Sequence, residues 1–118
     1  MARRDLTGAV DFAYLEGFAA GDAAMVEEVL GLFREQADMW RTMLEPGREG
    51  WRDALHAVKG TARGIGAFAL GAACERAEAE GAGGLAEVHT ALDAALFDIA
   101  AYLHERALKS LGPARSGA

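Results

Sequence analysis

The chain has 118 residues, 52% of them hydrophobic, and a formal net charge of −6, which provides for one compact domain with its own core. A globally acidic protein is a poor candidate for binding the phosphate backbone of a nucleic acid. No stretch approaches the roughly eighteen consecutive apolar residues of a membrane span. The start of the chain, MARRDLTGAV, lacks the apolar run of a secretory signal, so we expect a protein of the reducing cytoplasm.

Glycine residues separate the helices that the sequence predicts. The predicted helices are a short one over residues 10–19 and longer ones over 23–44, about 50–66, 67–80 and 85–111. Asp22 is expected to cap the second helix and Pro46 to end it. Residues 81–84, GAGG, are predicted to form a turn, and residues 112–118, GPARSGA, a loose tail.

Apolar residues repeat at three- and four-residue steps along the predicted helices, which is typical of helices that bury one face. Long helices joined by short turns pack antiparallel. We therefore predict an all-α, up-down-up-down four-helix bundle with a short extra N-terminal helix, forming one domain over residues 1–111. A coiled-coil dimer is the alternative, against which the many glycines and broken stripes argue. We expect a monomer and leave a weak dimer open.

The stretch HAVKGTARGIGA, residues 56–67, contains a histidine whose direction can be predicted. At about 100° per residue, the apolar side chains of this segment lie opposite His56. Its own side carries polar, charged or small residues: Glu49, Arg52, Lys59, Gly60 and Arg63. We expect His56 to face solvent instead of the core. An ordinary exposed histidine on a charged face is the alternative interpretation.

The neighbours of His56 favour chemistry with a phosphoryl group. Lys59 follows one turn later, and Arg52 and Arg63 flank the same side of the helix. Cations in these positions would neutralise phosphoryl oxygens on a histidine nucleophile. Gly60 presents no side chain and would leave clearance for a second protein. Close packing against another helix is the alternative reason for a glycine there.

The sequence HAVKGTARGIGAFAL, together with GD before the second helix, LFREQA within it and ACERAE in the fourth, resembles the histidine-containing phosphotransfer (HPt) domain of multistep phosphorelays. The resemblance covers nearly the whole chain. It implies that His56 is the phosphoacceptor, that Lys59 stabilises the phosphoryl oxygens, and that Gly60 leaves room for the receiver domain. It also implies that Gln36 is a hydrogen-bonding neighbour, although surface polarity explains Gln36 equally well.

The resemblance further implies receiver domains of hybrid histidine kinases and response regulators as partners, met by Gly60, Arg63 and Arg52. Arg63 is bulkier than the residue usual at its position, which predicts a preference for acidic partner surfaces. Ala77 stands where leucine is common, which predicts looser packing.

Phosphohistidine carriers of this kind have no autokinase activity, and the sequence shows no phosphate-binding glycine loop. We expect no cofactor and no metal, because His89 and His104 lie too far apart on one helix to share an ion with each other. The single cysteine, Cys74, forms no intrachain disulfide and is expected to be buried. A non-catalytic helical adaptor that binds a signalling partner is the alternative function.

Overall fold

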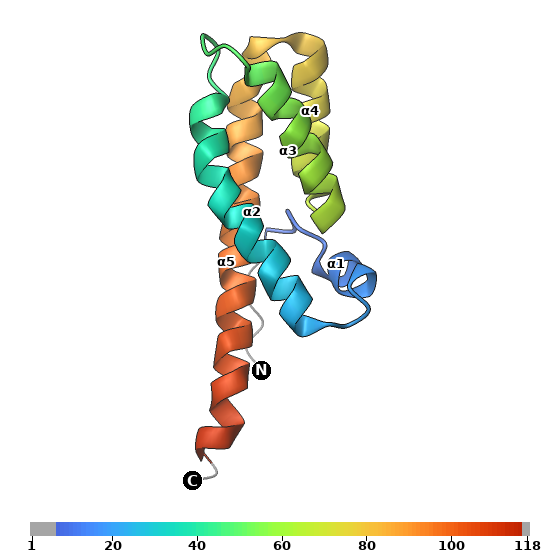
Figure 1. Cartoon of the computed structure of the whole chain (residues 1–118), viewed down its shortest axis with the longest axis vertical. Coiled ribbons are helices and arrows are strands. Elements are labelled where there is room, and N and C mark those ends of the chain that lie inside the picture. Colours follow the sequence, from blue (N-terminus) through green and yellow to red (C-terminus); the bar gives the residue numbers. More distant parts are fainter. Residues whose placement is uncertain (1–6, 117–118) are drawn as a thin grey trace.

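The computed structural model describes residues 7–116, and its side chains through residue 110; over that range it is all-helical and contains no strand (Figure 1). Its elements, in chain order, are α1 (Phe12–Phe18), α2 (Ala23–Met43), α3 (Trp51–Ile65), α4 (Phe68–Glu80), the short 3-10 helix η1 (Ala82–Gly84) and α5 (Leu85–Ser116). The predicted all-α class is confirmed. Within residues 7–116, no helix combines the length and the hydropathy that crossing a bilayer requires.

The helix ends follow local capping chemistry. The Asp22 carboxylate accepts a hydrogen bond from the Met25 backbone N–H at 3.1 Å, as predicted for the start of α2. The short helix α1 starts two residues later than predicted, because Asp11 caps it by accepting from the Tyr14 N–H at 3.0 Å. These two aspartates therefore fix where the first two helices begin.

The helix α5 is longer than the sequence suggests. It continues through residues 112–116, which were expected to be a loose tail, while residues 117–118 of that tail lie outside the described part of the chain. Proline removes one backbone hydrogen bond, but its φ is close to the helical value, so a helix can run past a Gly-Pro pair. The domain boundary at residue 111 stays a prediction.

The core lies between the four long helices. The helix α2 packs against α3 and α5, and α4 packs against the same two helices. All four contribute to the largest fully buried apolar side chains, which include Val26, Leu30, Phe33, Leu55, Val58, Leu70, Val88, Leu92 and Ile99, together with Leu44 at the end of α2. Cys74 is buried among them, which confirms its packing role, and this burial raises the pKa of its thiol to about 11.

A buried carboxylate holds the segment before α1 onto α5. Asp98 is fully buried and accepts hydrogen bonds from the Thr7 N–H at 2.8 Å, the Thr7 hydroxyl at 2.9 Å and the Ala9 N–H at 2.9 Å. Further along α5, the Tyr102 ring stacks on Phe12 with centroids 4.1 Å apart. The short first helix is thus anchored to the last one by polar and aromatic contacts.

Gly66 lets α1 sit close to the turn between α3 and α4. Its φ is +91°, and a Cβ on it would lie 2.7 Å from the Asp11 carbonyl oxygen. The Asp11 N–H also donates to the Gly66 carbonyl at 2.9 Å. Only glycine combines this left-handed conformation with such a close backbone approach.

The packing around Ala77 is tight, which corrects the expectation of looser packing there. A Cβ on Gly84 of η1 would lie 2.9 Å from the Cα of Ala77. The small residue on α4 therefore lets the following turn fold directly onto the helix.

Candidate functional site

His56 lies in the first half of α3 and points away from the core. The buried side of α3 consists of Ala54, Leu55, Val58, Ala62 and Ile65. The His56 side chain is 77% exposed, as the helical periodicity predicts. A ring in this position is open to a second molecule.

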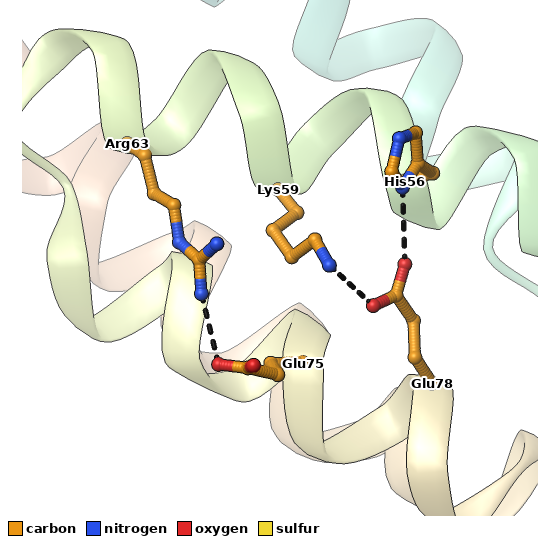
Figure 2. A network of polar contacts seen from close by, with 5 residues as sticks. All are labelled: His56, Lys59, Arg63, Glu75 and Glu78. Carbon is orange, nitrogen blue, oxygen red and sulfur yellow. Dashed lines mark hydrogen bonds and ion pairs between the residues drawn. The ribbon is translucent and has the colours of Figure 1, made fainter.

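Glu78 on α4 fixes the orientation of the imidazole. Nδ1 of His56 lies 3.3 Å from Oε2 of Glu78 (Figure 2). An ionised carboxylate can only accept hydrogen bonds, so Nδ1 carries the proton in this contact. In the neutral ring, the lone pair is then on Nε2, the nitrogen that does not contact Glu78.

Lys59 reaches the same carboxylate from the next turn of α3. Its Nζ lies 2.5 Å from Oε1 of Glu78, and its side chain is only 17% exposed. The hydrogen bond from Lys59, supported by that from His56, lowers the pKa of Glu78. Glu78 therefore stays ionised at neutral pH and holds the lysine and the imidazole next to each other.

The two arginines expected near His56 have other partners. The Arg63 guanidinium donates to Oε1 of Glu75 at 2.8 Å. Its side chain lies over α4, where a Cβ on Gly71 would come within 3.0 Å of the Arg63 Cγ. The Arg52 guanidinium stacks on the ring of Trp51, with its Cζ atom 4.4 Å from the ring centroid. Of the three cations expected around the imidazole, Lys59 is held beside it by Glu78, whereas Arg63 and Arg52 contact other groups. Their nearness to a phosphoryl group on His56 stays a prediction.

Gly60 packs against no other element in the part of the chain that the structure describes. It is exposed, and beyond the backbone of its own helix a Cβ built on it meets no described atom within 4 Å. Close packing against another helix therefore does not explain this glycine, whereas open space above the helix is consistent with the expected clearance.

Gln36 and His89 differ in their hydrogen bonds. Gln36 is exposed on α2, and among the described residues no hydrogen bond links it to His56. Nε2 of His89 lies 2.8 Å from the carbonyl oxygen of Leu44, where it caps the end of α2. Of the predicted site residues, Lys59 lies beside His56, and the carboxylate of Glu78 contacts both side chains.

Glu78 and Glu75 were not predicted as site residues, although the sequence contains a signal for Glu78. The chain reverses at Ala67 between α3 and α4. His56 lies eleven residues before Ala67 and Glu78 eleven residues after it. In an antiparallel helix pair, residues equally distant from the turn lie side by side.

Comparison with known proteins identifies one close structural relative. No protein-family model matches the chain, and no curated protein matches it. Among solved structures, the chain is similar to the crystal structure of the histidine phosphotransferase ShpA from Caulobacter crescentus. The two are 68% identical, the match covers 88% of this chain and 99% of that chain, and the TM-score is 0.82.

Proposed function

The chain belongs to the histidine phosphotransferase family, and on that basis we propose that it is a phosphorelay intermediate. His56 accepts a phosphoryl group from the aspartate of one receiver domain and passes it to another. The observation that carries the proposal is the exposed imidazole, whose Nδ1 is held by Glu78. The receivers belong to hybrid histidine kinases and response regulators.

In the proposed reaction, the Nε2 lone pair attacks the phosphorus of an aspartyl phosphate in line with the leaving carboxylate oxygen. The Nε2–P bond forms as the P–O bond breaks, and the receiver aspartate leaves as a carboxylate. The proton on Nδ1 remains there, and the charge of Glu78 stabilises the resulting imidazolium. The transfer is reversible, because the same contacts serve the return to a second aspartate.

Lys59 has a defined place in this reaction. A lysine ammonium has three N–H donors, and one of them points to Glu78. The other two are available to phosphoryl oxygens on His56, one helical turn away. Gln36 is proposed as an additional hydrogen-bond donor to the phosphorylated ring.

The topology of the bundle, the oligomeric state and the cellular compartment are part of the same proposal. The helices α2 to α5 form an antiparallel up-down-up-down bundle, which the short connections and the packing of neighbouring helices support. The protein acts as a monomer in the cytoplasm and carries a phosphoryl group without autokinase activity. The receiver supplies the metal ion that the transfer requires. No observation favours the alternative adaptor function.

Phosphotransfer from receiver domains tests the proposal directly. Receivers are loaded with labelled acetyl phosphate and mixed with the wild-type chain, which should gain an acid-labile, base-stable label. A His56→Gln variant should gain none. His104→Gln is the matched control, because His104 is also an exposed histidine, on α5, and should label normally. Equal labelling of the His56→Gln variant would contradict the assignment.

A further inference from the structure

The two ring nitrogens of His56 have different surroundings, and the difference bears on the phosphorylated ring as well. Nδ1 lies 3.3 Å from Oε2 of Glu78, and Nε2 points away from that carboxylate (Figure 2). The proposed transfer places the phosphoryl group on Nε2. The contact between Nδ1 and Glu78 is therefore still available in the phosphorylated protein.

The proton on Nδ1 decides how readily the phosphoryl group leaves the ring. When the next aspartate attacks the phosphorus, the Nε2–P bond breaks and its electron pair stays on Nε2. If Nδ1 carries a proton, the ring leaves as a neutral imidazole. If Nδ1 has lost that proton, the ring has to leave as an imidazolate anion, which is a much poorer leaving group. A phosphohistidine is thus a good donor only while Nδ1 is protonated.

Glu78 favours the protonated ring. Its hydrogen bond with Lys59, the largest influence on it, lowers the pKa of Glu78, so the carboxylate is ionised at neutral pH. A negative charge at hydrogen-bond distance from Nδ1 stabilises the positive charge of a protonated, phosphorylated imidazole. Because the His56 side chain is 77% exposed, water weakens this effect, and we expect it to extend protonation of the ring by about one pH unit.

The other charged groups of α3 are placed differently. Arg52, one turn before His56, stacks on an aromatic ring. Asp53, also one turn before it, is exposed, and among the described residues no hydrogen bond joins it to the imidazole. Lys59 is the nearest cation and opposes a positive ring. In the proposed reaction, however, Lys59 binds the phosphoryl oxygens, whose negative charge exceeds its own.

In the part of the chain that the structure describes, the elements packed against α3 bring no second carboxylate to Nδ1. From α4, Glu75 is paired with an arginine. From α2, the expected neighbour of the ring is the neutral Gln36. From α1, Asp11 meets α3 at Gly66, ten residues beyond the imidazole and so about 15 Å along the helix. Glu78 is thus the carboxylate that holds the proton on Nδ1.

We propose that Glu78 keeps Nδ1 of phosphorylated His56 protonated at neutral pH, and thereby keeps the phosphoryl group transferable to the next receiver. This inference rests on the proposed function. Glu78 acts through the imidazole and does not touch the phosphoryl group, so it is a positioning residue for the donor step.

The proton balance of the relay is closed by this arrangement. In the donor step, the Nε2–P bond breaks as a bond forms between the phosphorus and a carboxylate oxygen of the receiver. The electron pair returns to Nε2, and the ring leaves with its proton still on Nδ1. That is the tautomer with which the unphosphorylated protein began, so no proton has to enter or leave during the cycle.

The same property shortens the life of the phosphohistidine in water. The imidazole is largely exposed, and a water molecule that attacks the phosphorus expels the same neutral leaving group. Loss of the Glu78 charge should therefore slow both transfer to a receiver and hydrolysis without one, and both effects should grow as the pH rises.

The pH dependence of the donor step tests the proposal. Phosphoramidate loads the wild-type chain, Glu78→Gln and Glu75→Gln, and each is then mixed with the same receiver domain between pH 6 and 9. Glu75→Gln is the matched control, because it removes a charge from the same helix without a contact to the ring. We expect Glu78→Gln to transfer about tenfold more slowly than wild type at pH 8.5 and to approach the wild-type rate at pH 6, and Glu75→Gln to follow wild type.

Two further measurements need no receiver. ¹⁵N NMR of the phosphorylated chains should find that Nδ1 of His56 loses its proton about one pH unit lower in Glu78→Gln than in wild type. Hydrolysis of the phosphohistidine at pH 8 should be slower in Glu78→Gln. A merely structural role of Glu78 would instead lower the transfer rate by the same factor at every pH.

The outcomes separate this inference from the proposed function. Equal Nδ1 titrations and parallel pH profiles in wild type and Glu78→Gln would overturn the role of Glu78 and leave the relay intact. A wild type that phosphoramidate labels but that exchanges phosphate with no receiver would overturn the proposed function, while the NMR titration would still decide the role of Glu78. A wild type that neither donor labels would overturn both.

Discussion

Lys59 of α3 and Glu78 of α4 form an ion pair, with Nζ 2.5 Å from Oε1. The second oxygen of the same carboxylate contacts Nδ1 of His56. One glutamate therefore determines both the orientation of the imidazole and the position of the nearest cation. Its removal should affect phosphotransfer more than it affects the fold.

Replacing Glu78 should slow phosphotransfer in a graded way. Glu78→Gln keeps an oxygen that can accept from Nδ1–H but loses the charge, whereas Glu78→Ala loses both. We expect the Ala variant to be slower than the Gln variant, and the loss to reach up to about 100-fold, because a misplaced nucleophile loses much of its advantage. Receiver-to-chain transfer rates measure this effect.

The tautomer of His56 gives a second readout for Glu78. In wild type, ¹⁵N NMR at a pH where the ring is neutral should find the proton on Nδ1, and in Glu78→Ala a mixture of tautomers. Glu75→Ala is the control, because Glu75 contacts Arg63 and not the imidazole. An unaltered tautomer in Glu78→Ala would show that the 3.3 Å contact does not orient the ring.

Lys59→Ala should slow transfer with little loss of stability. The ammonium faces the site, and a near-surface ion pair contributes only about 0–1 kcal/mol to the free energy of unfolding. Lys59→Arg keeps the charge and should retain part of the activity. Transfer rates equal to wild type in Lys59→Ala would remove this residue from the mechanism.

The same variant should change stability in acid. Lys59 is the main cause of the lowered pKa of Glu78, whose ordinary value is 4.5. A lowered pKa in the folded state stabilises the fold above pH 4.5, and this contribution is lost as the pH falls through the folded-state pKa. Denaturant unfolding of wild type between pH 5 and 3 should therefore show a steeper loss of stability than unfolding of Lys59→Ala.

Gly60→Gln should make the protein more stable and less active. Glycine inside a helix is unfavourable by up to about 1 kcal/mol relative to alanine, and apart from the helix's own backbone no described atom stands within 4 Å of a Cβ at this position. The longer side chain should raise the melting temperature while it obstructs the receiver. A Gly60→Ala variant should gain stability with less obstruction, and full activity in Gly60→Gln would refute the need for clearance.

Alanine substitutions at Gly66 and Gly64 test whether the backbone conformation at Gly66 requires glycine. Gly66→Ala places a Cβ 2.7 Å from the Asp11 oxygen at a φ of +91°, so it should destabilise the fold by about 1–3 kcal/mol or more. Gly64→Ala meets open space at an ordinary helical position and should be neutral or stabilising. Urea unfolding of both variants measures the difference, and equal stability would mean that α1 shifts freely.

Cys74 should be unreactive in the folded protein. Burial raises the pKa of its thiol to about 11, from an ordinary value of 9.0. Between pH 9 and 11 the unfolded thiol ionises while the folded one stays protonated, so stability should fall as the pH rises through this window. Alkylation rates at pH 8 should follow global unfolding, and Cys74→Ala should flatten the alkaline stability profile.

The helices were predictable because their signals are local. The spacing of apolar residues and single caps such as Asp22 act within one or two turns, and the structure confirms α2 and α4 within one residue at each end. The end of α5 was not predictable, because a Gly-Pro pair can either end a helix or be included in its last turns. The anchoring of Thr7 by Asp98 was also missed, because it joins residues 91 positions apart.

The sequence predicted only those features of the site that α3 determines by itself. The periodicity of α3 places His56 outward, and the glycine at position 60 is open as expected. Which partners Lys59 and Arg63 have depends on α4, so the helical face of α3 alone gave the wrong electrostatic environment. Pairing residues by their distance from Ala67 would have found Glu78.

The carboxylate of Asp98 is fully buried, and three donors from Thr7 and Ala9 satisfy it. A version of the domain that is shortened for expression should therefore retain Thr7 and Ala9. A shortened version that starts at α1 would remove all three donors to this carboxylate and weaken the attachment of the first helix to the last.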